Sequence, residues 1–226
     1  MSPYSYPRYA YKAPPELAGP AGGRRPVIVV GAGPVGLAAA LDLAGHGVPV
    51  LVIDDDDTVS VGSRAICWSK RSLEYLDRIG VASAMNDKGV TWQNGRVFLR
   101  DRQVYEFDLL PEGGHKQPAF INLQQYYVEQ FLVDAALASP LVEIRFRNKM
   151  VGMRPGRDSV AVEVETPDGV YRIEAEYVLA ADGARSSARK MLGLSFAGKV
   201  FEDRFLIADV HMKADFPTER WFWFDP

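Results

Sequence analysis

The chain has little cysteine and little histidine: one cysteine, Cys67, and three histidines occur among its 226 residues. A single cysteine excludes an internal disulfide and fits a reducing compartment, so we expect a cytoplasmic protein. The histidines lie far apart in the sequence, at His46, His115 and His211. This spacing indicates neither a metal site nor a Ser-His-Asp catalytic site.

Long apolar runs and an excess of positive charge are also missing. No uncharged run approaches the roughly 20 residues that a membrane-spanning helix needs. The N-terminus has no basic stretch followed by an apolar one, so we expect no signal peptide. The formal net charge of −3 gives no electrostatic reason to expect nucleic acid or an anionic membrane as a partner. The length is sufficient for one large domain or two small ones.

The most informative feature that is present is a glycine-rich turn within residues 26–40, PVIVVGAGPVGLAAA. The pattern predicts a buried strand, a three-glycine turn and a helix of small residues. Gly31 would permit the tight turn, Gly33 would let a pyrophosphate approach the backbone, and Gly36 would let the helix pack against its strand. The free N–H groups and the helix dipole at this turn favour a phosphate.

A second apolar strand, residues 48–53, ends at Asp54, 23 residues after Gly31. The dinucleotide-binding fingerprint has an acid near this position, which binds the adenosine ribose hydroxyls. A carboxylate that caps a turn is the alternative for Asp54, and the acids at 55–57 fit a solvated turn. Strand, turn, helix, second strand and acid together favour dinucleotide binding over an ordinary structural turn.

The rest of the pattern indicates alternating helices and strands. Helices are expected at 34–45, 69–79, 124–138 and 186–192. Strands are expected at 26–31, 48–53, 97–99, 104–109, 141–146 and 177–181, with a β-meander at 148–154, 159–166 and 170–175. Tyrosine and proline mixed with glycine and alanine near the N-terminus predict a flexible tail or a weak docking arm, and we favour an inert tail.

These features resemble the single-component flavoprotein aromatic hydroxylases, whose reference fold is that of para-hydroxybenzoate hydroxylase. The glycine turn, the inserted meander, Arg64 in GSRA, Gln125 in QxxVExxL, and the Asp182-Gly183 pair after a strand occur in the family's order. The resemblance implies FAD-binding roles for Gly31, Gly33, Pro34, Val35, Gly36, Asp54, Arg64, Gln125, Asp182 and Gly183.

Taken singly, several of these residues have ordinary alternatives. Arg64 could be a surface arginine, Gln125 could cap a helix, and Asp182 could belong to a common Asp-Gly turn. Arg185 and Arg189 could be solvated or could attract an anionic nicotinamide cofactor.

The resemblance also implies a fold class and domain boundaries. The expected fold is α/β: a Rossmann-like FAD-binding three-layer ββα sandwich with a β-meander crossover, plus the beginning of a β-sheet substrate domain. The expected division is a flexible tail at 1–25, the FAD-binding domain at 26–89 and 119–195, substrate-domain strands at 90–118, and the start of the substrate-binding sheet at 196–226.

The implied activity is hydroxylation of a phenolic substrate by FAD, O₂ and NADPH or NADH, through a flavin 4a-hydroperoxide. Residues 120–132 and the aromatic end are most similar to the branch that acts on 3-(3-hydroxyphenyl)propionate. No catalytic side chain is assigned, because the cofactor performs the chemistry. A homodimer is compatible with the resemblance.

The chain departs from the family pattern in one respect. The family carries a second FAD-binding motif with a Gly-Asp pair, and no Gly-Asp dipeptide occurs here. We therefore expect the N-terminal part of a longer enzyme. One alternative is a flavin-dependent halogenase, because the W-x-W-x-I-P motif of that family is similar to residues 221–226 except at Asp225. A second alternative is a non-catalytic fragment that binds the adenine half of FAD weakly or not at all.

Overall fold

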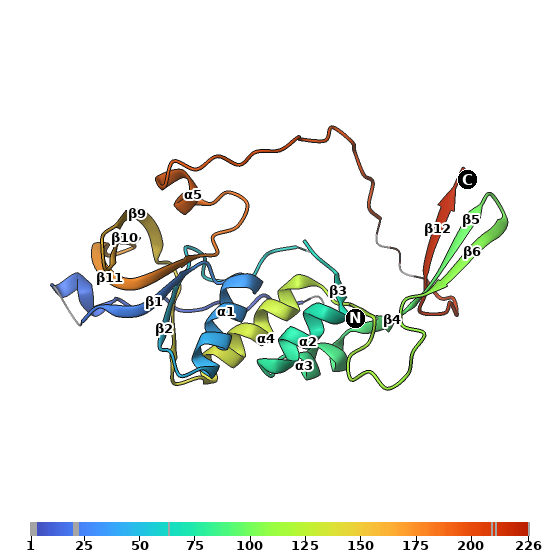
Figure 1. Cartoon of the computed structure of the whole chain (residues 1–226), viewed down its shortest axis with the longest axis horizontal. Helices are drawn as coiled ribbons and strands as arrows, with labels where there is room; N and C mark the ends of the chain where they lie inside the picture. Colours follow the sequence, from blue (N-terminus) through green and yellow to red (C-terminus); the bar gives the residue numbers. More distant parts are fainter. Residues whose placement is uncertain (1–3, 20–22, 63, 209, 211, 226) are drawn as a thin grey trace.

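A six-stranded mixed sheet organises the computed structural model, which describes residues 4–19, 23–62, 64–208, 210 and 212–225 (Figure 1). Its strands are β1 (Arg25–Val30), β2 (Val50–Ile53), β8 (Val142–Arg145), β9 (Lys149–Pro155), β10 (Val160–Thr166) and β11 (Gly169–Ala180). Their order is β8-β2-β1-β11-β10-β9. Neighbours among β8, β2, β1 and β11 are parallel, whereas β10 is antiparallel to β9 and β11.

Helices α1 (Pro34–Gly45) and α4 (Gln125–Ala138) cover one face of the parallel strands. Helices α2 (Lys70–Arg78) and α3 (Ala82–Lys88) pack farther from the sheet, with α3 against α4. Alternate strand residues such as Val29 and Val52 pack in one core cluster with Leu37 of α1 and Leu132 of α4. The residues between them belong to the second face, so β1 and β2 are apolar almost throughout, as expected for strands covered on both sides. No helix in the described ranges is long and apolar enough to cross a membrane.

The β-meander packs against the second face. Ile28 and Leu51 share a core cluster with Val162, Val164 and Ile173. This arrangement confirms the predicted mixed α/β class. The prediction of separate strands at 170–175 and 177–181 is wrong, because β11 is one continuous strand: it pairs with β10 along its first half and runs parallel to β1 from residue 175 onward.

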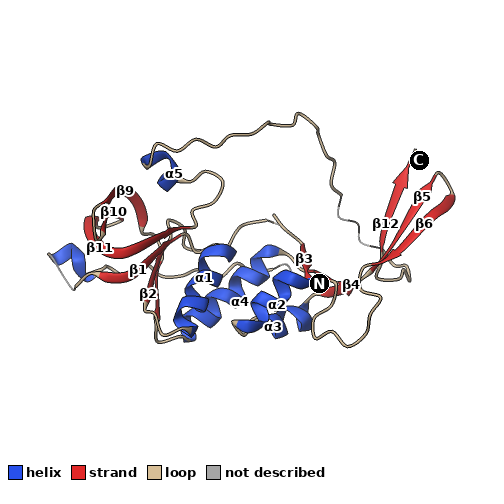
Figure 2. Ribbon diagram, viewed as in Figure 1, coloured by secondary structure: helices blue, strands red, loops and turns tan. Residues whose placement is uncertain are grey.

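The described residues also form two three-stranded sheets. One contains β3 (Cys67–Ser69), β7 (Phe120–Asn122) and β4 (Val90–Trp92), and the other contains β12 (Arg220–Phe224), β5 (Asn94–Leu99) and β6 (Arg102–Asp108). Figure 2 shows the β5-β6-β12 sheet at the opposite end of the molecule from the meander. Residues 194–208, which follow α5 (Ser187–Met191), belong to no helix or strand and run toward this sheet. The aromatic end is therefore paired in a sheet, and the predicted domain boundaries stay predictions.

The N-terminal segment differs from the expectation of a flexible, inert tail. Residues 4–19 lie against the core and include a short 3₁₀ helix, η1 (Pro15–Ala18). The Tyr9 ring stacks on Phe146 with ring centroids 4.3 Å apart. The buried Glu16 carboxylate pairs with Arg145 of β8. The tail prediction is wrong for these residues, because its aromatic and acidic side chains have partners far away in the sequence.

Candidate nucleotide-binding site

The glycine turn joins β1 to α1 and leaves no room for side chains at two positions. Gly31 has φ +107°, and a Cβ there would lie 2.5 Å from the carbonyl oxygen of Ala181. A Cβ at Gly36 would lie 1.9 Å from the carbonyl oxygen of Gly31. Glycine at these positions is therefore required by the close packing of β1, α1 and β11.

Gly33 is different, because a Cβ there would meet no protein atom within 4 Å. Gly33 is the N-cap residue of α1, and its backbone is extended. The first-turn N–H groups of such a helix have no intrahelical acceptor and attract anions. Packing does not explain a glycine at position 33, whereas a ligand that approaches the backbone does.

Asp54 follows β2 and holds the turn from the other side. One carboxylate oxygen accepts a hydrogen bond from the Ala32 N–H at 2.5 Å, and the other accepts from the Asp56 N–H at 2.8 Å. Burial raises the pKa of Asp54 above its ordinary value, although these two hydrogen bonds oppose the increase. The carboxylate thus lies beside the glycine turn, where the sequence predicted an acid.

The turn that follows β11 forms the side of the site opposite Asp54. Gly183 has φ +72°, and the Asp182 carboxylate accepts from the Ala188 N–H at 3.0 Å. Burial alone would raise the pKa of Asp182, but hydrogen bonds from the Ala188 backbone and the Ser186 hydroxyl lower it overall. Ser186 also caps α5 by accepting from the Arg189 N–H. Asp182 therefore lies in an Asp-Gly turn, the alternative that its sequence allows, and its carboxylate also accepts from the first turn of α5. A role of Asp182 toward a cofactor stays a prediction.

These elements enclose a cleft of about 420 Å³. Of the predicted residues, six line it: Gly31, Gly33, Asp54, Arg64, Asp182 and Gly183. Further lining residues that sequence reasoning did not assign to the site include Thr58, Ser60, Glu129, Asn148 and Lys149. Their positions come from loops and strand ends that only the folded sheet brings together.

Arg64 lies on the exposed side of the cleft, near Asp56. Burial and the charges of Asp55 and Asp57 raise the pKa of Asp56, and the Arg64 charge works against this increase. Arg64 thus partly compensates an acidic wall of the cleft.

Gln125 does not line the cleft but supports a residue that does. Its side-chain amide donates to Glu129 at 2.6 Å. The buried Glu129 carboxylate also accepts from the backbone N–H and the hydroxyl of Ser60, at 2.5 and 2.7 Å. A direct contact between Gln125 and a cofactor stays a prediction. Glu129 was part of the sequence motif, and its spacing of four from Gln125 on a helix could have identified the pair.

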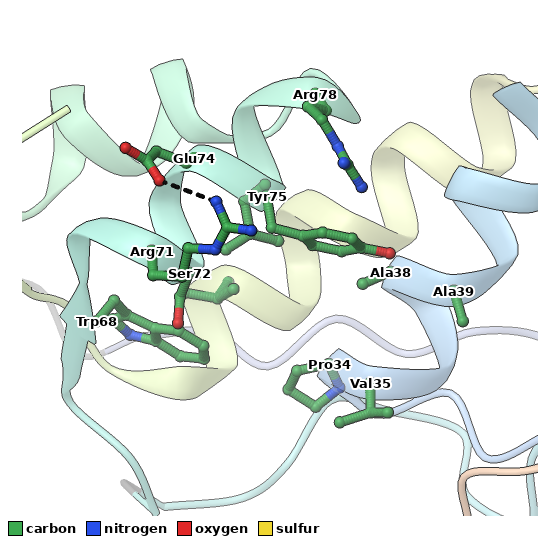
Figure 3. Close-up of a pocket in the computed structure, with 12 residues that line it drawn as sticks. Pro34, Val35, Ala38, Ala39, Trp68, Arg71, Ser72, Glu74, Tyr75 and Arg78 are labelled. Carbon is green, nitrogen blue, oxygen red and sulfur yellow. Dashed lines mark hydrogen bonds and ion pairs between the residues drawn. The ribbon is translucent and has the colours of Figure 1, made fainter. Parts of the chain in front are cut away.

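The side chains of Pro34 and Val35 line a different, apolar groove between α1 and α2 (Figure 3). This groove has a volume of about 780 Å³, with Trp68 and Tyr75 on the wall opposite α1. Arg71 and Glu74 are paired beside it. Any contact of Pro34 or Val35 with a nucleotide in the smaller cleft would therefore come from the backbone at the start of α1.

The comparisons with known proteins agree with this geometry. Residues 24–224 match the family described as the FAD binding domain. A flavin-dependent monooxygenase of Mycobacteroides abscessus is 34% identical over 193 residues, which are 81% of this chain and 40% of that protein. A 3-(3-hydroxy-phenyl)propionate/3-hydroxycinnamic acid hydroxylase of Mycolicibacterium smegmatis is 32% identical over 192 residues, 81% of this chain and 33% of the relative.

A solved structure shows the same fold. The crystal structure of p-nitrophenol 4-monooxygenase PnpA from Pseudomonas putida DLL-E4 superposes with a TM-score of 0.73 and 31% sequence identity, over 79% of this chain and 46% of that one. The chain thus spans less than half the length of these relatives. On the match over residues 24–224, it belongs to the family of FAD-binding monooxygenases.

Proposed function

We propose that the chain supplies the FAD-binding part of an NAD(P)H-consuming monooxygenase that hydroxylates a phenolic substrate. The observation that carries the proposal is the open space above Gly33, in a cleft that Asp54 borders. The names of the relatives support the substrate class, since they include a p-nitrophenol monooxygenase and a hydroxyphenylpropionate hydroxylase. A homodimer stays a prediction.

Each group of residues in the cleft has a distinct part in this proposal. The pyrophosphate of FAD would lie over Gly33 and the first turn of α1, and the Asp54 carboxylate would accept hydrogen bonds from the adenosine ribose hydroxyls. Asp182 and Gly183 would close the cleft from the β11 side, and Arg64 would lie toward the flavin. Bound FAD would supply hydride acceptance from NAD(P)H and activation of O₂.

A titration of the chain with FAD tests the proposal. We expect saturable, one-to-one quenching of flavin fluorescence, and we expect ADP to compete because the cleft receives the adenine half. If the chain binds neither FAD nor ADP, this part of the proposal is wrong and the alternative of a non-binding fragment is favoured. Oxidation of NADPH or NADH that depends on a phenol tests the hydroxylase activity in a protein of the relatives' full length.

The raised pKa of Asp54 predicts a pH-dependent affinity for ADP. Because the ionised carboxylate is the better acceptor for ribose hydroxyls, affinity should fall as the pH drops through this raised pKa. Asp54→Asn should weaken ADP binding about tenfold at pH 7 and flatten the profile. Calorimetric titrations at several pH values measure both effects.

The matched control is Asp158→Asn at an exposed turn, which should leave the profile unchanged. Asp56 also has a raised pKa. The Asp54→Asn variant therefore distinguishes a pH dependence that comes from Asp54 from one that comes from Asp56. A profile that is the same in Asp54→Asn and in the unmodified chain would refute the role of Asp54. The stability of the ligand-free protein should depend on pH in the opposite direction to its ADP affinity. Because the pKa of Asp54 is higher in the folded than in the unfolded state, its contribution to stability decreases as the pH rises from the unfolded to the folded pKa.

A further inference from the structure

The N-terminal arm, residues 4–18, precedes the part of the chain that matches the FAD-binding family, which begins at residue 24. It lies across residues 55–62, the loop that follows Asp54. No residue from 55 to 62 belongs to a helix or strand. The conformation of this loop therefore depends on contacts from outside it.

The arm supplies four such contacts. The Tyr9 N–H donates to the carbonyl of Asp57 at 2.7 Å, and the Thr58 hydroxyl donates to the carbonyl of Pro7 at 2.6 Å. The Gly62 N–H donates to the Tyr6 hydroxyl at 3.0 Å. An ion pair joins Arg8 to the Asp57 carboxylate. These contacts follow the loop along most of its length.

The arm is itself fixed to the core on both sides of these contacts. Tyr4 stacks on Tyr126 of α4 with ring centroids 4.2 Å apart, and its hydroxyl donates to Gln130 at 2.8 Å. At the other end, the Glu16 carboxylate accepts two hydrogen bonds from Arg145. The arm therefore connects the loop to α4 and β8 of the core.

The same loop is a wall of the nucleotide cleft. The loop residues that line the cleft are Asp55, Asp56, Thr58 and Ser60. Asp57 and Gly62 form hydrogen bonds with the arm, and Thr58 both lines the cleft and contacts the arm. Fixing a binding loop before the ligand arrives raises affinity, because the ordering entropy is not lost on binding.

We propose that the N-terminal arm is a strap that positions the 55–62 loop for the ADP half of a dinucleotide. This inference rests on the proposed function of the cleft and adds a second element to it. Tyr6 and Arg8 are positioning residues, since they act on the ligand through the loop. The strap gives a role to a tyrosine-rich and proline-rich segment that lies outside the family match.

The test compares two tyrosines that lose the same atom. Tyr6→Phe removes the hydroxyl that contacts the loop, whereas Tyr105→Phe removes an exposed hydroxyl on β6, outside both the arm and the cleft. Calorimetric titration with ADP should give about fivefold weaker binding for Tyr6→Phe and unchanged binding for Tyr105→Phe. Amide hydrogen exchange at Gly62 should accelerate only in Tyr6→Phe, and the melting temperature should change little because Tyr6 keeps its ring contacts.

A second variant strengthens the comparison. Tyr6→Phe combined with Arg8→Gln should weaken ADP binding about tenfold, and Arg8→Lys in place of Arg8→Gln should recover part of the loss. If the unmodified chain binds ADP and both strap variants bind it equally well, the strap is refuted while the proposed function stands. If the unmodified chain binds neither ADP nor FAD, the proposed function fails and the strap, as an aid to nucleotide binding, fails with it.

Discussion

Replacing Gly33 with valine is expected to weaken FAD binding by about 100-fold or more, equivalent to about 2.7 kcal/mol, in a protein that still folds. A Cβ at this position meets no protein atom within 4 Å, so a side chain at position 33 starts in open space in the ligand-free protein. The same side chain would occupy the space through which a pyrophosphate approaches the backbone. Fluorescence titration with FAD measures the loss, and thermal unfolding monitored by circular dichroism measures the retained fold.

Two other glycines of the same region serve as controls. Gly45→Val, at the far end of α1 where a Cβ also meets nothing, should leave FAD binding unchanged. Gly36→Val should fail differently, by loss of folding, because its Cβ would lie 1.9 Å from a backbone oxygen. Normal flavin binding by Gly33→Val would mean that the pyrophosphate lies elsewhere.

The second large effect is expected at Arg145, whose side chain is 6% exposed. Its guanidinium forms two hydrogen bonds with Glu16 and one each with Tyr171 and Glu143. Arg145→Met would leave the Glu16 carboxylate buried without this partner, and removal of one member of a buried pair costs about 3–5 kcal/mol. Urea denaturation at pH 7 measures the free energy of unfolding.

A double-mutant cycle identifies the source of the loss. Adding Glu16→Leu to Arg145→Met should recover much of the stability, because no buried charge is then unpaired. Arg172→Met, which removes an exposed ion pair with Glu163, should cost at most about 1 kcal/mol. An Arg145→Met variant no less stable than Arg172→Met would show that the buried pair contributes no more than an exposed one.

The Glu16–Arg145 pair also has a defined pH dependence. Burial alone would raise the pKa of Glu16, but the hydrogen bonds and charge of Arg145 lower it overall. The stabilisation is therefore complete above the ordinary pKa of a glutamate and is lost as pH falls through the lowered value.

The parts of the fold that depend on local pattern could be predicted from the sequence. The helix at 34–45 has the predicted bounds, because Pro34 starts it and small apolar residues continue it. The glycine turn and Asp54 were also predicted, since the fingerprint encodes strand, turn, helix and acid within 30 residues. These local signals include the residues that form the centre of the candidate site.

The remainder depends on contacts between distant residues. Tyr9 meets Phe146, and Glu16 meets Arg145 at a separation of 129 residues, so the composition of the arm alone predicted a loose tail. The long strand β11 pairs with β10 along its first part and with β1 along its second. The alternation of apolar and polar residues within one segment does not reveal such a change of partner. Helix α3 carried no strong periodic signal and was not predicted.

A structure of the chain with bound ADP would show whether the cleft beside Gly33 receives the nucleotide. We expect the pyrophosphate within hydrogen-bond distance of the backbone at Gly33 and the start of α1, and the ribose hydroxyls on the Asp54 carboxylate. An ADP molecule bound in another place, with this cleft left without a nucleotide, would refute the proposed binding site.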